Sequence, residues 1–481
     1  MLYKECIEYN CCVRPKKIAL IYEDKKYTFY ELKNIINLYE DMYILAGVKR
    51  RDIVIIIGKN TDIFVIQVFL CMKMEVIFIP LSEKISSIRY EYILKNSNAD
   101  FIFDISAGIL TRNPFFSPKR KANYFAEKIQ CIIYSSGSTS FPKGIMETEN
   151  AMIFSVHKIN ERIKNTEKDN ILVGIPLSFD YGLYQLFLGF SVGASIILLN
   201  GFDFVQRIPG IINKYGVTGL PLVPTVFELL LCSGRLNTKL NTLRYISSTG
   251  DTLNVESIQK FHNIFPNVQI IPMYGITECK RVFIMDNNWN KILNGSCGIP
   301  LDGIEVKIID KNGHKVGIME KGELIVSGKN VMAGYLYDNN STNEVFHFSE
   351  KERTLKTGDI FYVDQDGYYY FCGRMNRFIK RRGIKISPEE IENHLKTIKE
   401  IEQCVVIGVP HKIEGETIVL IIKKYENVEE VIVRKNLTNF FHVMPPEWIP
   451  SNIIFTNRYF PVNINGKVDR NKVEKMYIKK C

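Results

Sequence analysis

Strand-like and helical segments alternate through residues 27–278, and this alternation limits the folds open to the chain more than any other feature. Residues 27–47 predict a turn and an amphipathic helix, and residues 52–57 (DIVIII) predict a buried strand. Strand-like segments recur at 194–200, 243–251 and 268–278. Strands that alternate with helices indicate parallel sheets covered by helices on both faces. The sequence therefore predicts an α/β fold.

The pattern changes at about residue 298 to short strands joined by glycine turns, as in GIEVKIIDKNGH and GYYYFCG. Such segments are typical of hairpins and predict a compact β part. Further along, Ser387 and Pro388 predict the start of a helix with two glutamates in its first turn. Because 481 residues are too many for one ordinary core, we expect two domains or more.

One loop directly after a strand-like run has the composition of an anion site. Residues 132–146 read IIYSSGSTSFPKGIM, with five Ser or Thr hydroxyls, two glycines and a single lysine, Lys143. Backbone N–H groups, hydroxyls and one cation suit a polyphosphate. A Walker A loop is excluded, because Gly144 stands where that motif needs Ser or Thr after its lysine. A surface linker is the alternative. Two details argue against it: the loop follows a strand-like run directly, and its single lysine stands between Pro142 and Gly144.

Composition excludes several classes of protein. The net charge of +10 is spread along the chain, whereas nucleic-acid binders usually concentrate basic residues on one face or tail. The eleven cysteines show no metal-binding spacing, and with no signal peptide in the sequence we expect a reducing cytoplasm. Lys73 and Glu75 interrupt the apolar stretch 63–80, which therefore predicts a buried helix and a core strand rather than a membrane span.

Several short motifs follow the loop in order, and none is specific alone. They are MYGITE (273–278), KTGD (356–359) with Asp359 in an expected tight turn, a Gly-Arg pair ending at Arg374, and a Gly-Lys pair ending at Lys467. In this order and approximate spacing, the loop and motifs resemble the adenylate-forming superfamily of acyl-CoA synthetases, nonribosomal-peptide adenylation domains and luciferases. The resemblance covers essentially the whole chain. One departure is Ser140, which stands where the family has glycine.

The resemblance implies both a reaction and an architecture. A carboxylate attacks the α-phosphate of ATP to give an acyl-adenylate and pyrophosphate, and a thiol then displaces AMP. The implied fold is a large N-terminal domain of parallel β-sheets flanked by helices, with a small β-barrel-like part, followed by a small mobile α+β C-terminal domain. On this basis we expect domains at residues 1–375 and 376–481, a hinge at Asn376, and Gly383 in a loop that faces pantetheine.

The resemblance also implies roles around the nucleotide. The residues expected to contact ATP or AMP are Ser135, Ser136, Gly137, Ser138, Thr139, Lys143, Gly144, Thr249, Gly250, Asp251, Tyr274, Gly275, Thr277, Asp359 and Arg374. Tyr274 would stack on adenine, and Asp359 would accept hydrogen bonds from the ribose. Glu278 looks like the Mg²⁺ ligand, because a hard cation that bridges phosphates prefers carboxylate oxygen. Lys467, Thr139 and Glu278 are the catalytic candidates, and Lys467 resembles the lysine that bridges the substrate carboxylate and the phosphate.

The acid that is activated remains open between two classes. Residues 176–187 correspond to the acyl-pocket stretch, and the expected pocket residues are Phe179, Asp180, Leu183, Gly275 and Cys279. Amino-acid-activating relatives pair such an aspartate with the substrate ammonium, and Asp180 fits that role. The segment also resembles bacterial acyl-CoA ligases, in which a buried Asp180 must find another partner or lie near solvent. We favour an acyl or aryl acid, for which Asp180→Asn should be mild.

Three functions are therefore weighed. The first is a stand-alone acid–thiol ligase that uses ATP, Mg²⁺ and a small carboxylic acid, with CoA or a separate carrier protein as the thiol acceptor. The second is an amino-acid adenylation enzyme that loads a separate peptidyl carrier protein. The third, an inactive binding protein, is disfavoured because the charged candidates from Lys143 to Lys467 are all present. No nucleic acid is expected as a partner.

Overall fold

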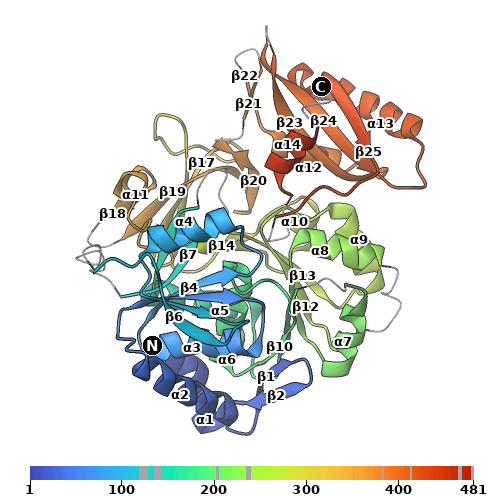
Figure 1. The fold of residues 1–481 in the computed structure, drawn as a ribbon. Coiled ribbons are helices and arrows are strands. Elements are labelled where there is room, and N and C mark those ends of the chain that lie inside the picture. Colours follow the sequence, from blue (N-terminus) through green and yellow to red (C-terminus); the bar gives the residue numbers. More distant parts are fainter. Residues whose placement is uncertain are drawn as a thin grey trace.

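The protein folds into a large body and a separate C-terminal lobe, which contains the chain's last helix and strands (Figure 1). The computed structural model describes residues 1–118, 128–134, 142–201, 205–233, 240–349, 352–375, 378–381, 384–411, 414–463 and 468–477.

A six-stranded sheet forms one layer of the large body, with strand order β6-β5-β3-β4-β7-β8. Its strands are β3 (Ile53–Gly58), β4 (Ile77–Ser82), β5 (Phe101–Asp104), β6 (Ile109–Arg112), β7 (Ile129–Tyr134) and β8 (Gly144–Thr148). The four central strands run parallel, and β6 and β8 pair antiparallel at the edges.

A nine-stranded sheet forms the second layer, with strand order β15-β14-β13-β12-β11-β9-β10-β1-β2. Its strands are β1 (Ile18–Tyr22), β2 (Lys25–Thr28), β9 (Asn170–Val173), β10 (Ser195–Leu198), β11 (Gly219–Leu222), β12 (Tyr245–Ser248), β13 (Gln269–Ile276), β14 (Lys280–Ile284) and β15 (Ile299–Pro300). The run from β1 to β13 is parallel, whereas β2, β14 and β15 pair antiparallel.

Helices pack on both layers. They are α1 (Asn10–Val13), α2 (Phe29–Leu45), α3 (Asp62–Lys73), α4 (Ser87–Ser97), α5 (Glu149–Ile163), α6 (Asp180–Val192), α7 (Ile208–Tyr215), α8 (Pro224–Cys232), α9 (Val255–Ile264) and α10 (Trp289–Leu293), with shorter helical turns at Lys4–Tyr9 and Val205–Arg207. Helices α3 and α5 each contact strands of both sheets, so they lie between the layers. Threonine caps define where α2, α3 and α5 begin. The side chains of Thr28, Thr61 and Thr148 accept hydrogen bonds from backbone N–H groups in the first turns of these helices.

A small antiparallel sheet follows, with strand order β16-β17-β19-β18 and β20 beside β19. It consists of β16 (Ile304–Ile309), β17 (Gly322–Gly328), β18 (Phe346–Phe348), β19 (Arg353–Val363) and β20 (Tyr369–Arg374), with helix α11 (Asn339–Val345) before β18. The expectation of a tight turn at Asp359 is wrong. Asp359 lies within β19, where Gly358 adopts a φ of 69° at an irregularity in the pairing with β17.

The C-terminal lobe is an α+β unit, as expected. Its sheet has the order β22-β21-β24-β23 with β25 beside β24. The elements are β21 (Ile379–Arg381), β22 (Ile384–Ile386), α12 (Pro388–Leu395), β23 (Ile401–His411), β24 (Gly415–Lys424), α13 (Glu430–Val443), a turn at Pro446–Trp448, β25 (Asn452–Thr456) and α14 (Arg470–Tyr477). Ser387 caps α12 by accepting from the Glu390 N–H at 3.2 Å, which confirms the predicted helix start.

The predicted α/β architecture is confirmed. The alternating segments form largely parallel sheets, and the glycine-rich segment forms the antiparallel one. The apolar stretch at 63–80 forms α3 and most of β4, both buried. Across the described ranges, no helix combines the length and the apolar character that a membrane crossing needs.

Candidate active site

Two predicted nucleotide contacts follow a strand end in the nine-stranded sheet. Strands β12 and β13 are parallel neighbours, with Ser248 opposite Pro272, so residues beyond both strands meet at one edge of the sheet. Thr249 and Gly250 follow β12 directly. The hydroxyls of Ser248 and Thr249 are buried and have no hydrogen-bond partner within the described part of the chain. Since a buried hydroxyl without a partner is costly, this edge fits a polar ligand.

The turn between β13 and β14 brings further predicted residues to the same edge. Gly275 lies just before this turn, near the end of β13, and must be glycine because a Cβ on it would lie 1.6 Å from the Lys280 carbonyl oxygen. Thr277 is partly exposed in the turn, and Asp251 is exposed near β12.

Tyr274, Asp359 and Arg374 form one connected group. The Tyr274 hydroxyl donates to Asp359 Oδ2 at 2.7 Å, and Arg374 Nε lies 3.0 Å from Asp359 Oδ1. Asp359 is 1% exposed, so this ion pair is largely shielded from water on the carboxylate side. The neighbouring Asp359 carboxylate raises the pKa of Arg374. The Tyr274 ring also contacts Phe283 and Phe361, and its stacking on adenine stays a prediction.

Lys143 and Glu278 lie on two sides of Tyr335, a residue that the sequence did not single out. The Tyr335 hydroxyl donates to Glu278 Oε1 at 2.9 Å, and Lys143 Nζ lies 4.7 Å from the centre of the Tyr335 ring. Lys143 Nζ is also 3.8 Å from Asp338 Oδ2. Burial, followed by the Glu278 charge, raises the pKa of the Tyr335 hydroxyl well above its usual range, so it stays a donor. The structure thus joins the end of the predicted phosphate loop to the predicted Mg²⁺ ligand.

Some predicted residues fall where the structure gives no description. They are Ser135, Ser136, Gly137, Ser138, Thr139, Asn376, Gly383 and Lys467, together with the variant position Ser140. Gly144 does lie within the description, as the first residue of β8, and its carbonyl accepts from Leu336 N at 2.7 Å.

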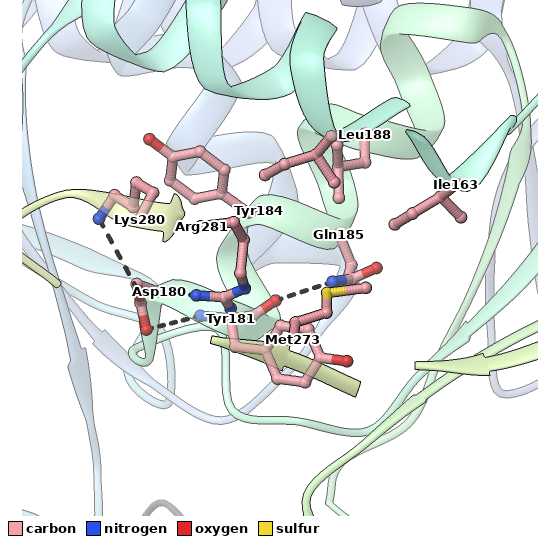
Figure 2. A pocket seen from close by; sticks show the side chains of 10 residues that line it. Ile163, Asp180, Tyr181, Tyr184, Gln185, Leu188, Met273, Lys280 and Arg281 are labelled. Atoms are coloured by element: carbon pink, nitrogen blue, oxygen red, sulfur yellow. Dashed lines mark hydrogen bonds and ion pairs between the residues drawn. The ribbon is translucent and has the colours of Figure 1, made fainter. Parts of the chain in front are cut away.

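Asp180, at the start of α6, belongs to a buried cluster of four charged side chains, of which Figure 2 shows Asp180, Lys280 and Arg281. Asp180 Oδ2 lies 3.9 Å from Lys280 Nζ and 4.0 Å from Arg281 Nη1. Lys280 also forms an ion pair with Glu147, the fourth member. The four side chains are between 0% and 7% exposed. Asp180 thus has two cationic partners from β14, Lys280 and Arg281. Their positive charges offset the cost of burying its carboxylate.

The backbone at Lys280 is strained, because the residue there is a lysine and not a glycine. Its φ of 54° lies in the left-handed region, where a non-glycine residue costs roughly 1–2 kcal/mol. A glycine at this position would relieve the strain. It would also remove the Lys280 ammonium, the only cation in the described structure that contacts both carboxylates of the cluster. Burial raises the pKa of Glu147, and the Lys280 charge opposes that rise.

A small cavity lies against this cluster. Its walls are Ile159, Ile163, Asp180, Tyr181, Tyr184, Gln185, Leu188, Met273, Lys280 and Arg281. Among the predicted acyl-pocket residues, Asp180 is the one found in its wall. Leu183 and Cys279 are instead fully buried in the main hydrophobic core, and Phe179 packs beside Tyr181 in a small separate cluster. The signal that could have pointed to the cavity is the Lys-Arg pair two residues after Glu278 in a strand-like segment.

Comparison with known proteins agrees with this arrangement. The family described as AMP-binding enzyme matches residues 7–336, and the AMP-binding enzyme C-terminal domain matches residues 390–467. Zwittermicin A synthase ZmaJ of Bacillus cereus is 29% identical, with 95% of this chain and 91% of that protein covered. The 2-succinylbenzoate–CoA ligase of Bacillus pumilus is 27% identical, with 96% of both chains covered.

A solved structure extends the likeness to the fold. The o-succinylbenzoate CoA synthetase of Bacillus subtilis, in complex with its acyl-adenylate intermediate, has a TM-score of 0.82, 25% identity and 98% coverage of both chains. The expectation of an ATP-dependent, AMP-forming acid–thiol ligase is confirmed by these relatives. Since the two family models together span most of the sequence, the chain belongs to the AMP-binding enzyme family.

Proposed function

We propose that the protein activates an acyl or aryl carboxylic acid without an amino group and transfers it to the thiol of CoA or of a separate carrier protein. The observation that carries this choice is the pairing of Asp180 with Lys280 and Arg281. An ammonium-binding carboxylate needs a free negative charge in the pocket. Here that charge is already compensated within the protein, so an amino-acid substrate would have to compete with two buried cations.

The residues at the sheet edge would serve the adenylation step. Lys143 would place positive charge beside the phosphates, and Asp359 with Arg374 would hold the ribose. No cluster of three or more His, Cys, Asp or Glu side chains that could hold a metal is found in the described ranges. That suits Mg²⁺, which is usually held by one or two carboxylates and the substrate phosphates, with Glu278 as the protein ligand. When bound, the ion would supply charge neutralisation at the phosphates.

The domain boundary supports a mobile C-terminal lobe. The small antiparallel sheet ends with Arg374, and the sheet of the lobe begins at Ile379, so the proposed hinge at Asn376 falls between two separate sheets. We propose that residues 376–481 move as a unit between the two half-reactions, carrying Lys467 to and from the phosphates and bringing Gly383 to the pantetheine.

Replacing Tyr335 by Phe should slow adenylation about 10-fold and raise the Mg²⁺ concentration needed for half-maximal rate. The change removes the hydroxyl that donates to Glu278 and keeps the ring against which Lys143 lies. The measurement is the rate of pyrophosphate release as a function of Mg²⁺ concentration. Tyr362→Phe is a matched control, since its ring stacks on Tyr370 in the small sheet. An unchanged Mg²⁺ dependence would remove Tyr335 from the site.

Replacing Asp180 by Asn should lower the free energy of unfolding by about 1–3 kcal/mol, because it leaves Arg281 buried without its carboxylate. This replaces the expectation of a mild effect, which took the pocket to be mostly apolar. Activity should fall for the fatty or aromatic acids as well as for any amino acid the enzyme accepts. Urea unfolding and a comparison of kcat/KM across acids check both points. A loss confined to amino acids would instead favour the amino-acid alternative.

The experiment that tests the proposed function is ATP–pyrophosphate exchange with a panel of fatty, aromatic and amino acids. We expect exchange with fatty or aromatic acids and little with amino acids. The active acid is then incubated with CoA or with phosphopantetheinylated carrier protein, and the thioester is measured. Exchange with amino acids alone would contradict the proposal.

A further inference from the structure

The cavity beside Asp180 has a polar wall that the adenylation chemistry itself does not require. Tyr181, Tyr184 and Gln185 come from α6, and Lys280 and Arg281 from β14, while Ile159, Ile163, Leu188 and Met273 complete the lining. Figure 2 shows Tyr181, Tyr184 and Gln185 of α6 together with Lys280 and Arg281 of β14 around the cavity. A pocket for a purely hydrocarbon chain would gain nothing from this polar lining, since burying charge without a ligand partner is costly.

Most polar groups in the wall are already satisfied. The Tyr181 hydroxyl donates to the Ser247 carbonyl at 2.9 Å, and Tyr184 donates to Glu147 at 3.1 Å. Gln185 Nε2 donates to the Tyr181 carbonyl at 3.1 Å. Lys280 has its charge compensated by Glu147.

Arg281 is the exception in this wall. Its side chain is 7% exposed, and its nearest carboxylate oxygen in the described structure, on Asp180, is 4.0 Å from Nη1, beyond hydrogen-bond distance. Its guanidinium also lies 4.8 Å from the centre of the Tyr181 ring. The guanidinium has five N–H donors, and none of them donates a hydrogen bond to another residue in the described part of the chain. A nearly buried guanidinium on a cavity wall with unused donors points to an oxygen acceptor that arrives with the ligand.

The free space is small. The cavity volume is about 10 Å³, roughly the room that one water molecule needs. Tyr181, Tyr184 and Met273 occupy much of the surrounding volume. A long fatty chain or a fused ring would have to displace several of these packed side chains, and a short chain would displace fewer.

The cavity lies on the same hairpin as the predicted nucleotide residues. Met273 directly precedes Tyr274 on β13, and Arg281 follows Glu278 by three positions. Side chains alternate between the two faces of a strand, so Met273 and Tyr274 point to opposite sides. The cavity therefore lies within a few residues of the predicted nucleotide contacts on one β-hairpin.

We propose that the activated acid has a short acyl chain that carries an oxygen acceptor, a hydroxyl or a second carboxylate, and that Arg281 binds this acceptor. The inference rests on the proposed function and specifies its substrate class. Arg281 is then the residue that sets specificity, and Asp180 positions it.

The test compares kcat/KM for pyrophosphate release with matched four-carbon acids: butanoate, 3-hydroxybutanoate, succinate and 2-aminobutanoate. Decanoate and benzoate serve as size controls, with a broad panel of amino acids alongside. We expect 3-hydroxybutanoate or succinate to exceed butanoate by about 10²-fold, since a site built to bind an oxygen group discriminates against an analogue that lacks it. A preference for 3-hydroxybutanoate would indicate that Arg281 binds a neutral hydroxyl, and a preference for succinate would indicate that it binds a carboxylate.

Arg281→Met supplies the second arm, because methionine keeps the apolar stem and removes the guanidinium. The preference for the oxygenated acid over butanoate should fall to less than about 10-fold. This ratio is measured on one preparation and therefore does not depend on the folded fraction. Arg162→Met is the matched control: Arg162 donates to the carbonyls of Ile284 and Pro300 and is outside the cavity wall, so the preference should persist.

The outcomes separate the inference from the proposed function. Preference for butanoate, decanoate or benzoate in the unaltered enzyme, or a preference that survives Arg281→Met, would overturn the inference and leave the acid–thiol ligase intact. Pyrophosphate release with amino acids alone would contradict both the inference and the proposed substrate class. Release with none of the acids would count against the adenylation activity itself.

Discussion

Replacing Lys467 by Ala should slow formation of the acyl-adenylate by about 10²–10³-fold, the usual loss when one preorganised transition-state contact is removed. The first half-reaction brings two anions together, the carboxylate and the phosphate, so a cation between them stabilises the transition state more than the separate reactants. The second half-reaction, attack of the thiol on the acyl carbon, has no such requirement. It should therefore proceed at nearly the original rate from a supplied acyl-adenylate.

The measurement is a pair of single-turnover rates, one for each half-reaction, on the same protein preparation. Lys472→Ala is the matched control, because Lys472 is an exposed lysine near the same end of the chain that pairs with Asp469 at 3.4 Å. It should leave both rates unchanged. Equal losses in the two half-reactions of Lys467→Ala would contradict the assigned role and indicate a folding defect.

Replacing Lys280 by Met should lower the free energy of unfolding by about 3–5 kcal/mol, the cost of leaving buried charges without their partner. Lys280 is 2% exposed and contacts both Glu147 and Asp180, so its loss leaves one guanidinium for two buried carboxylates. Methionine inherits the same positive φ, so the backbone strain is unchanged and the difference reports the charge. Urea unfolding gives the value.

Two comparisons sharpen this second prediction. Lys158→Met removes an exposed lysine paired with Glu161 and should cost less than about 1 kcal/mol. Burial already raises the pKa of Glu147 above its ordinary 4.5, and losing Lys280 removes an opposing influence. A carboxyl whose folded-state pKa is raised destabilises the fold as pH rises above its unfolded pKa, so the loss should shrink as pH falls towards 4.5. A loss below 1 kcal/mol at pH 7 would show that the cluster is hydrated or rearranged.

The sequence predicted the sheets well because periodicity is a local property. The strand predicted at 52–57 corresponds to β3, the run predicted up to Tyr134 corresponds to the end of β7, and Gly275 lies near the end of β13. The error at Asp359 has a local cause as well. Thr-Gly-Asp is typical of a turn, but the pairing with β20 places Asp359 opposite Arg374 inside a strand with a positive φ at Gly358.

The charge cluster could not be predicted, because its members are distant in sequence. Glu147 and Lys280 are 133 positions apart and meet only when β8, at the edge of one sheet, and β14, in the other, pack around α5. Asp180 was found because a resemblance pointed to its segment, whereas its partners carry no motif. Tyr335 was missed for a similar reason: a Gly-Tyr turn is common, and its contact with Glu278 depends on the small antiparallel part of the fold.

Product analysis tests the central claim, AMP-forming activation of a carboxylic acid, most directly. The purified protein is incubated with ATP and Mg²⁺, with and without the best acid of the panel, and the nucleotide and phosphate products are separated. The account predicts AMP and pyrophosphate in equal amounts, formed only when the acid is present. ADP and inorganic phosphate as the products, or release that does not depend on any acid, would contradict it.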